Sequence, residues 1–358
     1  MSGIFLEVLG RDAGSVAAWD RYVTAHPAGT IYHLSAWRTI FEKSFNYRSW
    51  LLMARDDASG AVTGVLPLYL VSAPFSRRLV SVPFRDRGGP LWNTSRAFDA
   101  LVAEARSIAA TLNAKSVRFK TTCPYPKTLV DNNSMREHVH WVHSAIDLKG
   151  ITADTLWDQI GDKNRNMVRQ AQRHRLLCEK LSLNEEALRK WHDLHLATQK
   201  RLGIPPFPIT FFMCMFQELT KANGIAVFGV RQGERPLAST LLLLHGTTAI
   251  YGYSASVGDG QRYRANDLML FEVIRWLVDG GFQCLDLGSD SPKQHSLLFF
   301  KRKWLAAQSP IPVYGFDGDQ SVILDSSSRA FALARKSFAL LPTAMAHAAG
   351  RTITKYFG

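Results

Sequence analysis

The chain has 358 residues, of which 46% are hydrophobic and 20% are charged. This length and composition predict two globular domains or one large one and exclude a wholly disordered chain. The formal net charge is +13, which favours anionic partners such as nucleic acid, phosphate-bearing molecules or an anionic membrane surface.

The first half of the chain alternates between helical and strand patterns. We predict these elements from their amphipathic or strand-like periodicity and from the turn residues between them. We expect helices over 15–26 and 35–43, strands over 50–54, 61–71 and 79–83, a helix over 95–112, and a strand over 116–120.

The second half repeats this pattern without repeating the residues. We expect helices over 152–175, 184–200 and 210–222, strands over 224–230, 236–244 and 248–256, a helix over 266–278, and a strand over 283–287. Each half therefore has the order strand, strand, strand, helix, strand, with hairpin turns between the first strands. An α+β fold of two similar half-molecules follows, with domains at 1–150 and 151–315.

The C-terminal residues 325–358 are predicted to form a basic amphipathic helical tail, hinged at Pro342. Docking of this tail on the body of the protein is the favoured interpretation. Adhesion to the inner face of the cytoplasmic membrane is the alternative.

The four cysteines, Cys123, Cys178, Cys214 and Cys284, are far apart in the sequence. Their spacing excludes a disulfide scaffold, a zinc finger or an iron–sulfur cluster, and we expect no metal site. The N-terminus lacks a secretory signal, and no stretch of about 18 apolar residues occurs. We therefore expect a cytoplasmic protein, with peripheral membrane contact as the alternative.

A basic helix between Lys163 and Arg175 is the most informative local feature. Arg165, Arg169 and Arg173 recur every four residues, so they lie on one helix face and repel one another. A bound polyphosphate would relieve that repulsion through charge-assisted hydrogen bonds. A solvated basic surface is the alternative.

Two further segments carry candidate chemistry. Arg262 and Arg264 precede the start of a helix, where backbone N–H groups also favour an anion; a flexible surface loop is the alternative. After the turn at Asp286–Gly288, Lys301 lies between aromatic residues. A desolvated ammonium there is suited to stabilising an oxyanion or binding phosphate, and an ordinary surface lysine is the alternative.

The sequence contains no GxxxxGK[ST], GxSxG, HExxH or GxGxxG signature. A transferase that mainly positions two substrates requires none of these motifs.

An ordered set of short motifs resembles the FemAB-like branch of the GNAT superfamily, and in particular the FemAB-related proteins found beside PEP-CTERM and exopolysaccharide loci. Residues 152–304 resemble the related BioF-like acetyltransferase domain. The motifs are His26-Pro-x-Gly-Thr, His33-Leu-x-x-Trp37, Pro83-Phe-Arg-Asp-Arg-Gly-Gly-Pro90, the basic helix 163–175, Thr198 with Arg201-Leu-Gly-Ile-Pro205, Tyr251-Gly-Tyr253, Asp286-x-Gly288 and Phe300-Lys301-x-x-Trp304.

The resemblance implies a tandem of two duplicated GNAT-like domains, here with a C-terminal helical extension. Its best-known members transfer an amino acid from aminoacyl-tRNA to a peptidoglycan precursor. Three features depart from the family. Lys120 follows Arg118-Phe119 where some members have a carboxylate, a long helical arm is absent, and 262–267 lacks the glycines of the loop that binds acetyl-CoA pyrophosphate.

The resemblance implies an N-acyltransferase or aminoacyltransferase acting on an amine of a cell-envelope or exopolysaccharide precursor. An acyl-CoA-dependent N-acetyltransferase of polysaccharide biosynthesis is one alternative. A non-catalytic module that binds RNA or a membrane surface is another. We expect no tightly bound cofactor, because the acyl donor, aminoacyl-tRNA or acyl-CoA, is a co-substrate. The expected partners are an anionic, phosphate-bearing small molecule or lipid-linked precursor and tRNA, but not DNA.

Each candidate residue receives a role on this basis. Lys301 is assigned to oxyanion stabilisation, Asp286 to its orientation and Tyr253 to proton relay, although a wall or core tyrosine is favoured at that position. The candidate substrate-binding residues are Lys163, Arg165, Arg169 and Arg173, then Arg201, Arg262 and Arg264, and finally Trp37, for which packing is favoured over sugar stacking.

Overall fold

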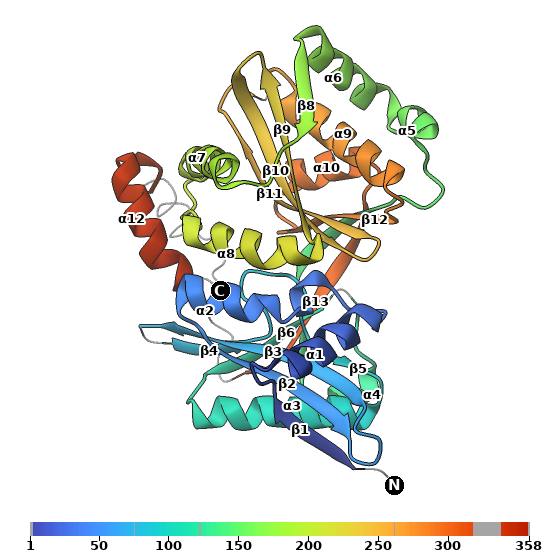
Figure 1. The fold of residues 1–358 in the computed structure, drawn as a ribbon, viewed down its shortest axis with the longest axis vertical. Helices are drawn as coiled ribbons and strands as arrows, with labels where there is room; N and C mark the ends of the chain where they lie inside the picture. Colours follow the sequence, from blue (N-terminus) through green and yellow to red (C-terminus); the bar gives the residue numbers. More distant parts are fainter. Residues whose placement is uncertain (1–2, 75, 122, 261, 318–337, 357–358) are drawn as a thin grey trace. The chain divides into compact units, whose positions relative to one another are not determined.

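The protein is described from a computed structural model, which covers residues 3–74, 76–121, 123–260, 262–317 and 338–356. The chain divides into two units. Unit 1 consists of Met1–Trp141, Pro310–Asp325 and Ile353–Gly358, and unit 2 of Val142–Ser309 and Ser326–Thr352. Figure 1 shows the elements of both units.

Unit 1 is a mixed sheet in the order β1-β2-β3-β4-β6-β13. The first four strands are antiparallel, β6 is parallel to β4, and β13 is antiparallel to β6. Helix α3 supplies the crossover that a parallel pair requires. The strands are β1 (Ile4–Val8), β2 (Arg48–Asp56), β3 (Val62–Ala73), β4 (Ser76–Val80), β5 (Leu91–Trp92), β6 (Ser116–Lys120) and β13 (Ala307–Asp317).

Helices cover both faces of the sheet of unit 1. They are α1 (Ala13–Ala25), η1 (Ile31–His33), α2 (Ala36–Phe45), α3 (Ser95–Thr111) and α4 (Lys127–Asn132). One core cluster gathers the apolar face of α3 against β2, β3 and β6, and another forms between α1 and the sheet. Thr94 caps α3 by accepting a hydrogen bond from the backbone N–H of Ala97.

Unit 2 has the same strand order, β8-β9-β10-β11-β12-β7. Its strands β8 to β11 are antiparallel, β12 is parallel to β11, and β7 is antiparallel to β12. Helix α9 provides the crossover. The strands are β7 (Arg136–Asp147), β8 (Leu176–Lys180), β9 (Ile225–Gln232), β10 (Arg235–His245), β11 (Thr248–Ser256) and β12 (Cys284–Asp290).

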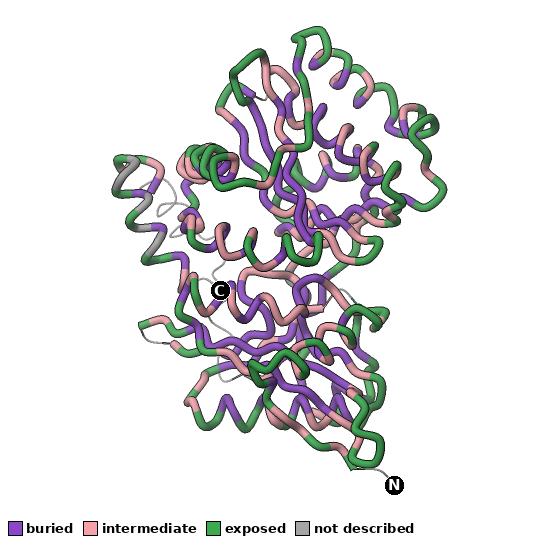
Figure 2. The backbone as a smooth tube through the Cα atoms, in the orientation of Figure 1, coloured by how far each residue is buried: buried purple, intermediate pink, exposed green. Residues whose placement is uncertain are grey.

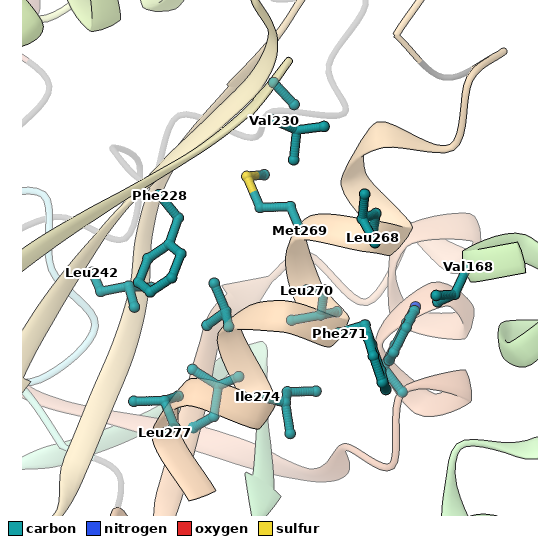
Figure 3. Close-up of a cluster of buried hydrophobic side chains, with 14 of the residues drawn as sticks. Val168, Phe228, Val230, Leu242, Leu268, Met269, Leu270, Phe271, Ile274 and Leu277 are labelled. Carbon is teal, nitrogen blue, oxygen red and sulfur yellow. The ribbon is translucent and has the colours of Figure 1, made fainter. Parts of the chain in front are cut away.

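The helices of unit 2 enclose a large apolar core. They are α5 (Ala153–Gln159), α6 (Gly161–Arg173), α7 (Glu185–Leu202), α8 (Ile209–Leu219), η2 (Thr220–Ala222), α9 (Ala265–Asp279) and α10 (His295–Lys303). Leu268, Met269 and Ile274 of α9 pack between the sheet and α6 (Figure 3). In Figure 2 the strands of the sheet are mostly buried, whereas the outer helix surfaces are exposed.

The matching strand orders confirm the predicted duplication of an α+β unit. Strands β7 and β13 each contribute residues to both units. The strands β1, β5, β7, β8 and β13 were not predicted. The single helix expected over 152–175 is two helices, because Gly161 adopts a positive φ of 70° between α5 and α6.

The predicted C-terminal tail is described only in part. Its first predicted helix falls mostly within residues 318–337, which lie outside the described residues, and the tail ends in α12 (Thr343–Ile353) and η3 (Thr354–Tyr356). This end docks on unit 1, where Tyr47 donates a hydrogen bond to the carbonyl of Lys355 at 2.5 Å and Arg78 to that of Tyr356 at 2.8 Å. Among the described residues, no helix has both the length and the apolar character needed to cross a membrane.

Candidate active site

A cavity of about 610 Å³ opens in unit 2 where β11 and β12 stop pairing. The parallel ladder runs from Thr248–Cys284 to Ile250–Asp286. Both strands then leave the regular register, with Gly252 as an extra residue opposite β10 and an irregularity after Asp286 opposite β7. The cavity is lined by Met167, Tyr251, Gly252, Ser254, Arg264, Asn266, Asp267, Leu270, Leu287, Ser296, Leu297, Phe300, Lys301 and Lys303.

The bulge at Gly252 separates two tyrosines that a regular strand would place on one face. Tyr251 lines the cavity and packs against the core beneath α9. Tyr253 instead packs among the rings of Phe207, Phe211 and Phe212, at centroid distances between 5.1 and 6.0 Å. Tyr253 is therefore a core residue and does not line the cavity, which leaves the predicted proton relay without structural support.

Lys301 reaches the cavity from α10 and is only 8% exposed. Its ammonium donates hydrogen bonds to the carbonyl of Leu287 at 2.6 Å and to Asp290 Oδ2 at 2.5 Å. The two side chains of this ion pair are each 10% exposed. The Lys301 ammonium is thus held in the wall of the cavity by one carboxylate and by backbone carbonyls.

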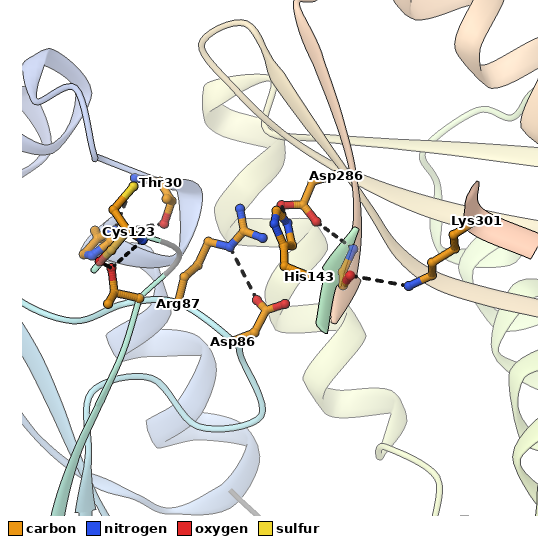
Figure 4. A network of polar contacts seen from close by, with 10 residues as sticks. Thr30, Asp86, Arg87, Cys123, His143, Asp286 and Lys301 are labelled. Carbon is orange, nitrogen blue, oxygen red and sulfur yellow. Dashed lines mark hydrogen bonds and ion pairs between the residues drawn. The ribbon is translucent and has the colours of Figure 1, made fainter. Parts of the chain in front are cut away.

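Asp286 lies on β12 and is 1% exposed. One carboxylate oxygen accepts from the backbone N–H of Gly288 at 2.6 Å, and the other lies 2.9 Å from His143 Nε2 (Figure 4). Gly288 adopts a φ of 75°, which favours glycine. Asp286 is thus bonded to the irregular segment whose carbonyl at Leu287 accepts a hydrogen bond from Lys301.

Charged side chains also surround the start of α9. Arg264 donates to Gln170 Oε1 at 3.2 Å, and the Lys303 ammonium lies 3.6 Å from Met167 Sδ. Asp267 is 7% exposed, and its Oδ1 has no hydrogen-bond partner among the described residues. Burial raises the pKa of Asp267, while the charges of Lys303 and Arg264 and the indole N–H of Trp304 act in the opposite direction.

The basic face of α6 does not line the cavity, to which this helix contributes only Met167. Lys163, Arg169 and Arg173 are exposed, and the Arg169 guanidinium lies 5.2 Å from the ring centroid of Trp157. Arg165 is paired with Asp162 at 2.5 Å. The predicted repulsion along this face is therefore weaker than its spacing indicates, because a local carboxylate neutralises one of the arginines.

The remaining predicted binding residues are dispersed. Arg201 bonds the backbone carbonyls of Ser256 and Val257, and Arg262 is exposed. Trp37 is wholly buried in unit 1 and donates to the carbonyl of Ile31 at 2.8 Å. The sugar-stacking role considered for Trp37 is wrong, because a ring with no exposed surface cannot stack on a substrate.

His195 lies in the same aromatic cluster as Tyr253 and is 1% exposed. Neither ring nitrogen of His195 has a hydrogen-bond partner in the described part of the chain, and the Trp191 ring stacks on it at 5.2 Å. Burial and then the nearby His192 lower its pKa to about 3. No group of three or more His, Cys, Asp or Glu side chains suited to a metal occurs among the described residues.

Replacement of His195 by phenylalanine is expected to stabilise the protein in mild acid. The unfolded chain binds this proton near pH 6.5 and the folded chain only near pH 3, so the free energy of unfolding falls as pH drops between those values. We expect His195→Phe to change the free energy of unfolding more favourably at pH 5 than at pH 7.5, by about 2 kcal/mol. Urea unfolding at the two pH values measures this, and an identical pH dependence in both proteins would contradict it.

Of the residues predicted from the sequence, Lys301 and Arg264 line the cavity. Asp286 lies directly behind the segment of the cavity wall that contains Leu287. Sequence reasoning missed Ser254, Asn266, Asp267 and Lys303. Lys303 stands at an unspecified position of the Phe300-Lys301-x-x-Trp304 motif, and Asp267 belongs to the segment 262–267, which was noted for Arg262, Arg264 and its lack of glycine. Their placement depends on the separation of β11 and β12, which no local pattern indicates.

Comparisons with known proteins find similarities in one domain and in the fold. Residues 162–295 match the acetyltransferase (GNAT) domain family. The crystal structure of FemX matches with a TM-score of 0.68 at 15% identity, covering 84% of this chain and 95% of FemX. A search of curated protein sequences finds no match.

Two further solved structures share the fold. A tandem GNAT protein from the clavulanic acid biosynthesis pathway matches with a TM-score of 0.57 at 11% identity, covering 89% of this chain and 99% of that protein. The C-terminal domain of a putative lysylphosphatidylglycerol synthetase from Agrobacterium fabrum matches with a TM-score of 0.55 at 15% identity, covering 91% and 95%.

Residues 162–295 are therefore similar to GNAT acetyltransferase domains. The chain as a whole shares its fold of two similar units with FemX and with the tandem GNAT protein.

Proposed function

We propose that the protein transfers an acyl or aminoacyl group to an amine of a cell-envelope or exopolysaccharide precursor, with the reaction taking place in the cavity of unit 2. The observation that carries this proposal is the buried Lys301 ammonium in the wall of the cavity beside the separated strands β11 and β12. The similarity to FemX supports the envelope precursor, and the net charge of +13 supports a phosphate-bearing substrate.

The reaction requires little covalent chemistry from the protein. The acceptor amine attacks the carbonyl carbon of an activated ester or thioester, and a C–N bond forms. The carbonyl oxygen becomes an oxyanion, which the Lys301 ammonium stabilises. The C–O or C–S bond then breaks, the alcohol or thiol leaves with a proton, and the amide is released. Holding the two substrates together supplies much of the rate enhancement.

The position of Asp267 in the wall of the cavity supports an aminoacyl group as the transferred group. The Asp267 carboxylate lines the cavity at the start of α9, and its Oδ1 has no hydrogen-bond partner among the described residues. The ammonium of an aminoacyl group would satisfy that oxygen and offset its burial. Arg264 and Lys303, on the same wall, are suited to the phosphates of such a donor.

The second candidate is an acyl-CoA-dependent N-acetyltransferase, which the match of residues 162–295 to the acetyltransferase domain favours. The two donors make opposite demands on Asp267, because acetyl-CoA carries no ammonium.

Asp267→Asn is expected to weaken binding of an aminoacyl-tRNA about 10- to 100-fold, since one charge-assisted hydrogen bond is lost, and to leave acetyl-CoA binding unchanged or stronger. Asp279→Asn, at the exposed end of the same helix, is the matched control. Dissociation constants of the purified proteins for both donors measure this. Equal affinities of wild type and Asp267→Asn for aminoacyl-tRNA would contradict the aminoacyl assignment, and binding of neither donor would contradict the proposed function.

A further inference from the structure

A group of basic side chains gathers on one face of the sheet of unit 1. Arg118 and Lys120 alternate along β6 and therefore share a face, while Val117 and Phe119 between them pack into the core beneath α3. Arg78 on the parallel strand β4 is in register with Ser116, which places Arg78 on the same face as Arg118. All three basic side chains are half-buried and keep part of their surface open to solvent.

The loop between β4 and β5 brings a fourth cation to this face. The backbone N–H of Ser81 donates to the carbonyl of Arg118, and that of Gly89 donates to the carbonyl of Lys120, both at 3.0 Å. These bonds fix the segment that carries Arg85 and Asp86 against the edge of β6. The Arg85 guanidinium also lies over the rings of Tyr32 and Trp37, at 5.4 and 5.6 Å from their centroids. We call Arg78, Arg85, Arg118 and Lys120 the Lys120 cluster.

Lys120 differs from the other members of the Lys120 cluster in its contacts. The described residues give the Lys120 ammonium no hydrogen bond and no ion pair. Asp86 is the carboxylate with the largest effect on it, but Asp86 is shared with Arg87 at 3.4 Å (Figure 4). Burial and the charges of the three arginines of the cluster lower the pKa of Lys120 to about 8, against the attraction of Asp86.

We propose that the Lys120 cluster is a binding site for a phosphate dianion, either free or as the phosphate group of a larger molecule. Strands β4 and β6 and the loop each contribute an arginine whose charge acts on Lys120, and the several oxygens of a phosphate can accept from several such donors. The two negative charges of a phosphate dianion attract the Lys120 ammonium more strongly than the single charge of a carboxylate would. The site belongs to unit 1 alone, so it stands independently of the transfer reaction proposed for unit 2.

Calorimetric titration of the full-length protein with inorganic phosphate, at pH 7 and low ionic strength, tests the site directly. Wild type is expected to bind one phosphate, and Lys120→Met to bind it at least 10-fold more weakly. Asp86→Asn is expected to bind several-fold more tightly, because it removes the competing carboxylate. Arg77→Gln, an exposed arginine adjacent to Arg78 on β4, is the matched control and should bind as wild type does.

A second measurement keeps the proposal testable if a variant folds poorly. Reductive ¹³C-methylation of the wild-type lysines gives each a resonance, and that of Lys120 is identified by its absence in Lys120→Met. Saturating phosphate is expected to raise the midpoint of its titration, since a bound anion favours the ammonium. Titration with UDP in place of phosphate identifies the kind of ligand. Tighter binding of UDP than of inorganic phosphate would indicate that the site takes the phosphate group of a nucleotide. Absence of phosphate binding by wild type, or an unmoved Lys120 midpoint, would overturn the proposal.

Discussion

Replacement of Lys301 by methionine is expected to lower the rate of acyl transfer about 10²- to 10³-fold, the range found when a preorganised oxyanion donor is removed. The Lys301 ammonium is the buried cation in the wall of the cavity, held by Asp290 and the carbonyl of Leu287. Methionine keeps most of the length and apolar volume of the side chain and removes the charge. Single-turnover transfer rates of the two proteins measure this effect.

Loss of activity must be separated from loss of folding, because Lys301→Met leaves the buried Asp290 carboxylate without its partner. We expect the free energy of unfolding to fall by about 3 kcal/mol. The double variant Lys301→Met/Asp290→Asn removes the stranded charge and is expected to recover most of that stability while transfer stays low. Recovery of transfer together with stability would show that Lys301 is structural and contradict its assigned role.

Asp286→Ala is expected to lower transfer about 10²-fold. The substitution removes the acceptor of the Gly288 N–H and the partner of His143, so the segment that carries the Leu287 carbonyl loses its fixed geometry. Because Asp286 acts by positioning Lys301, we expect kcat to fall while KM for the donor changes little. Steady-state kinetics at several donor concentrations measure this split.

Asp286→Asn tests how Asp286 acts. An asparagine oxygen still accepts from the Gly288 N–H, so this variant should recover part of the rate lost in Asp286→Ala. Asp147→Asn, an exposed residue of β7 that pairs with β12, is the matched control and should be unaffected. A parallel rise in KM, or equal activity of the alanine and asparagine variants, would contradict positioning through this segment.

The repeated unit could be predicted from the sequence because hairpin turns and amphipathic helices are local patterns. The strand from Ala61 to Val71 and the helix after Asn266 were found close to their actual limits. The strands β7 and β13 could not be predicted from the sequence, because they belong to the sheet only through pairing with residues distant in the sequence. The helix break at Gly161 was overlooked, although glycine was the available signal.

The site could be predicted only in part, for a similar reason. Lys301 and Asp286 stand in short motifs, and the structure places the first in the cavity wall and the second directly behind it. Asp267 was missed because its role depends on the cavity, which opens at a bulge in β11. Arg165 was assigned to phosphate although Asp162, three residues earlier, neutralises it.

The central claim is that the acyl donor occupies the cavity between β11 and β12. Amide hydrogen exchange of the full-length protein, with and without a saturating non-hydrolysable aminoacyl-tRNA analogue or acetyl-CoA, tests this without knowledge of the acceptor. We predict that one of these donors slows exchange at residues 251–254 of β11 and 265–270 of α9, while the exposed face of α6 changes little. Protection confined to α6 or to unit 1, with none at β11 and α9, would contradict the account.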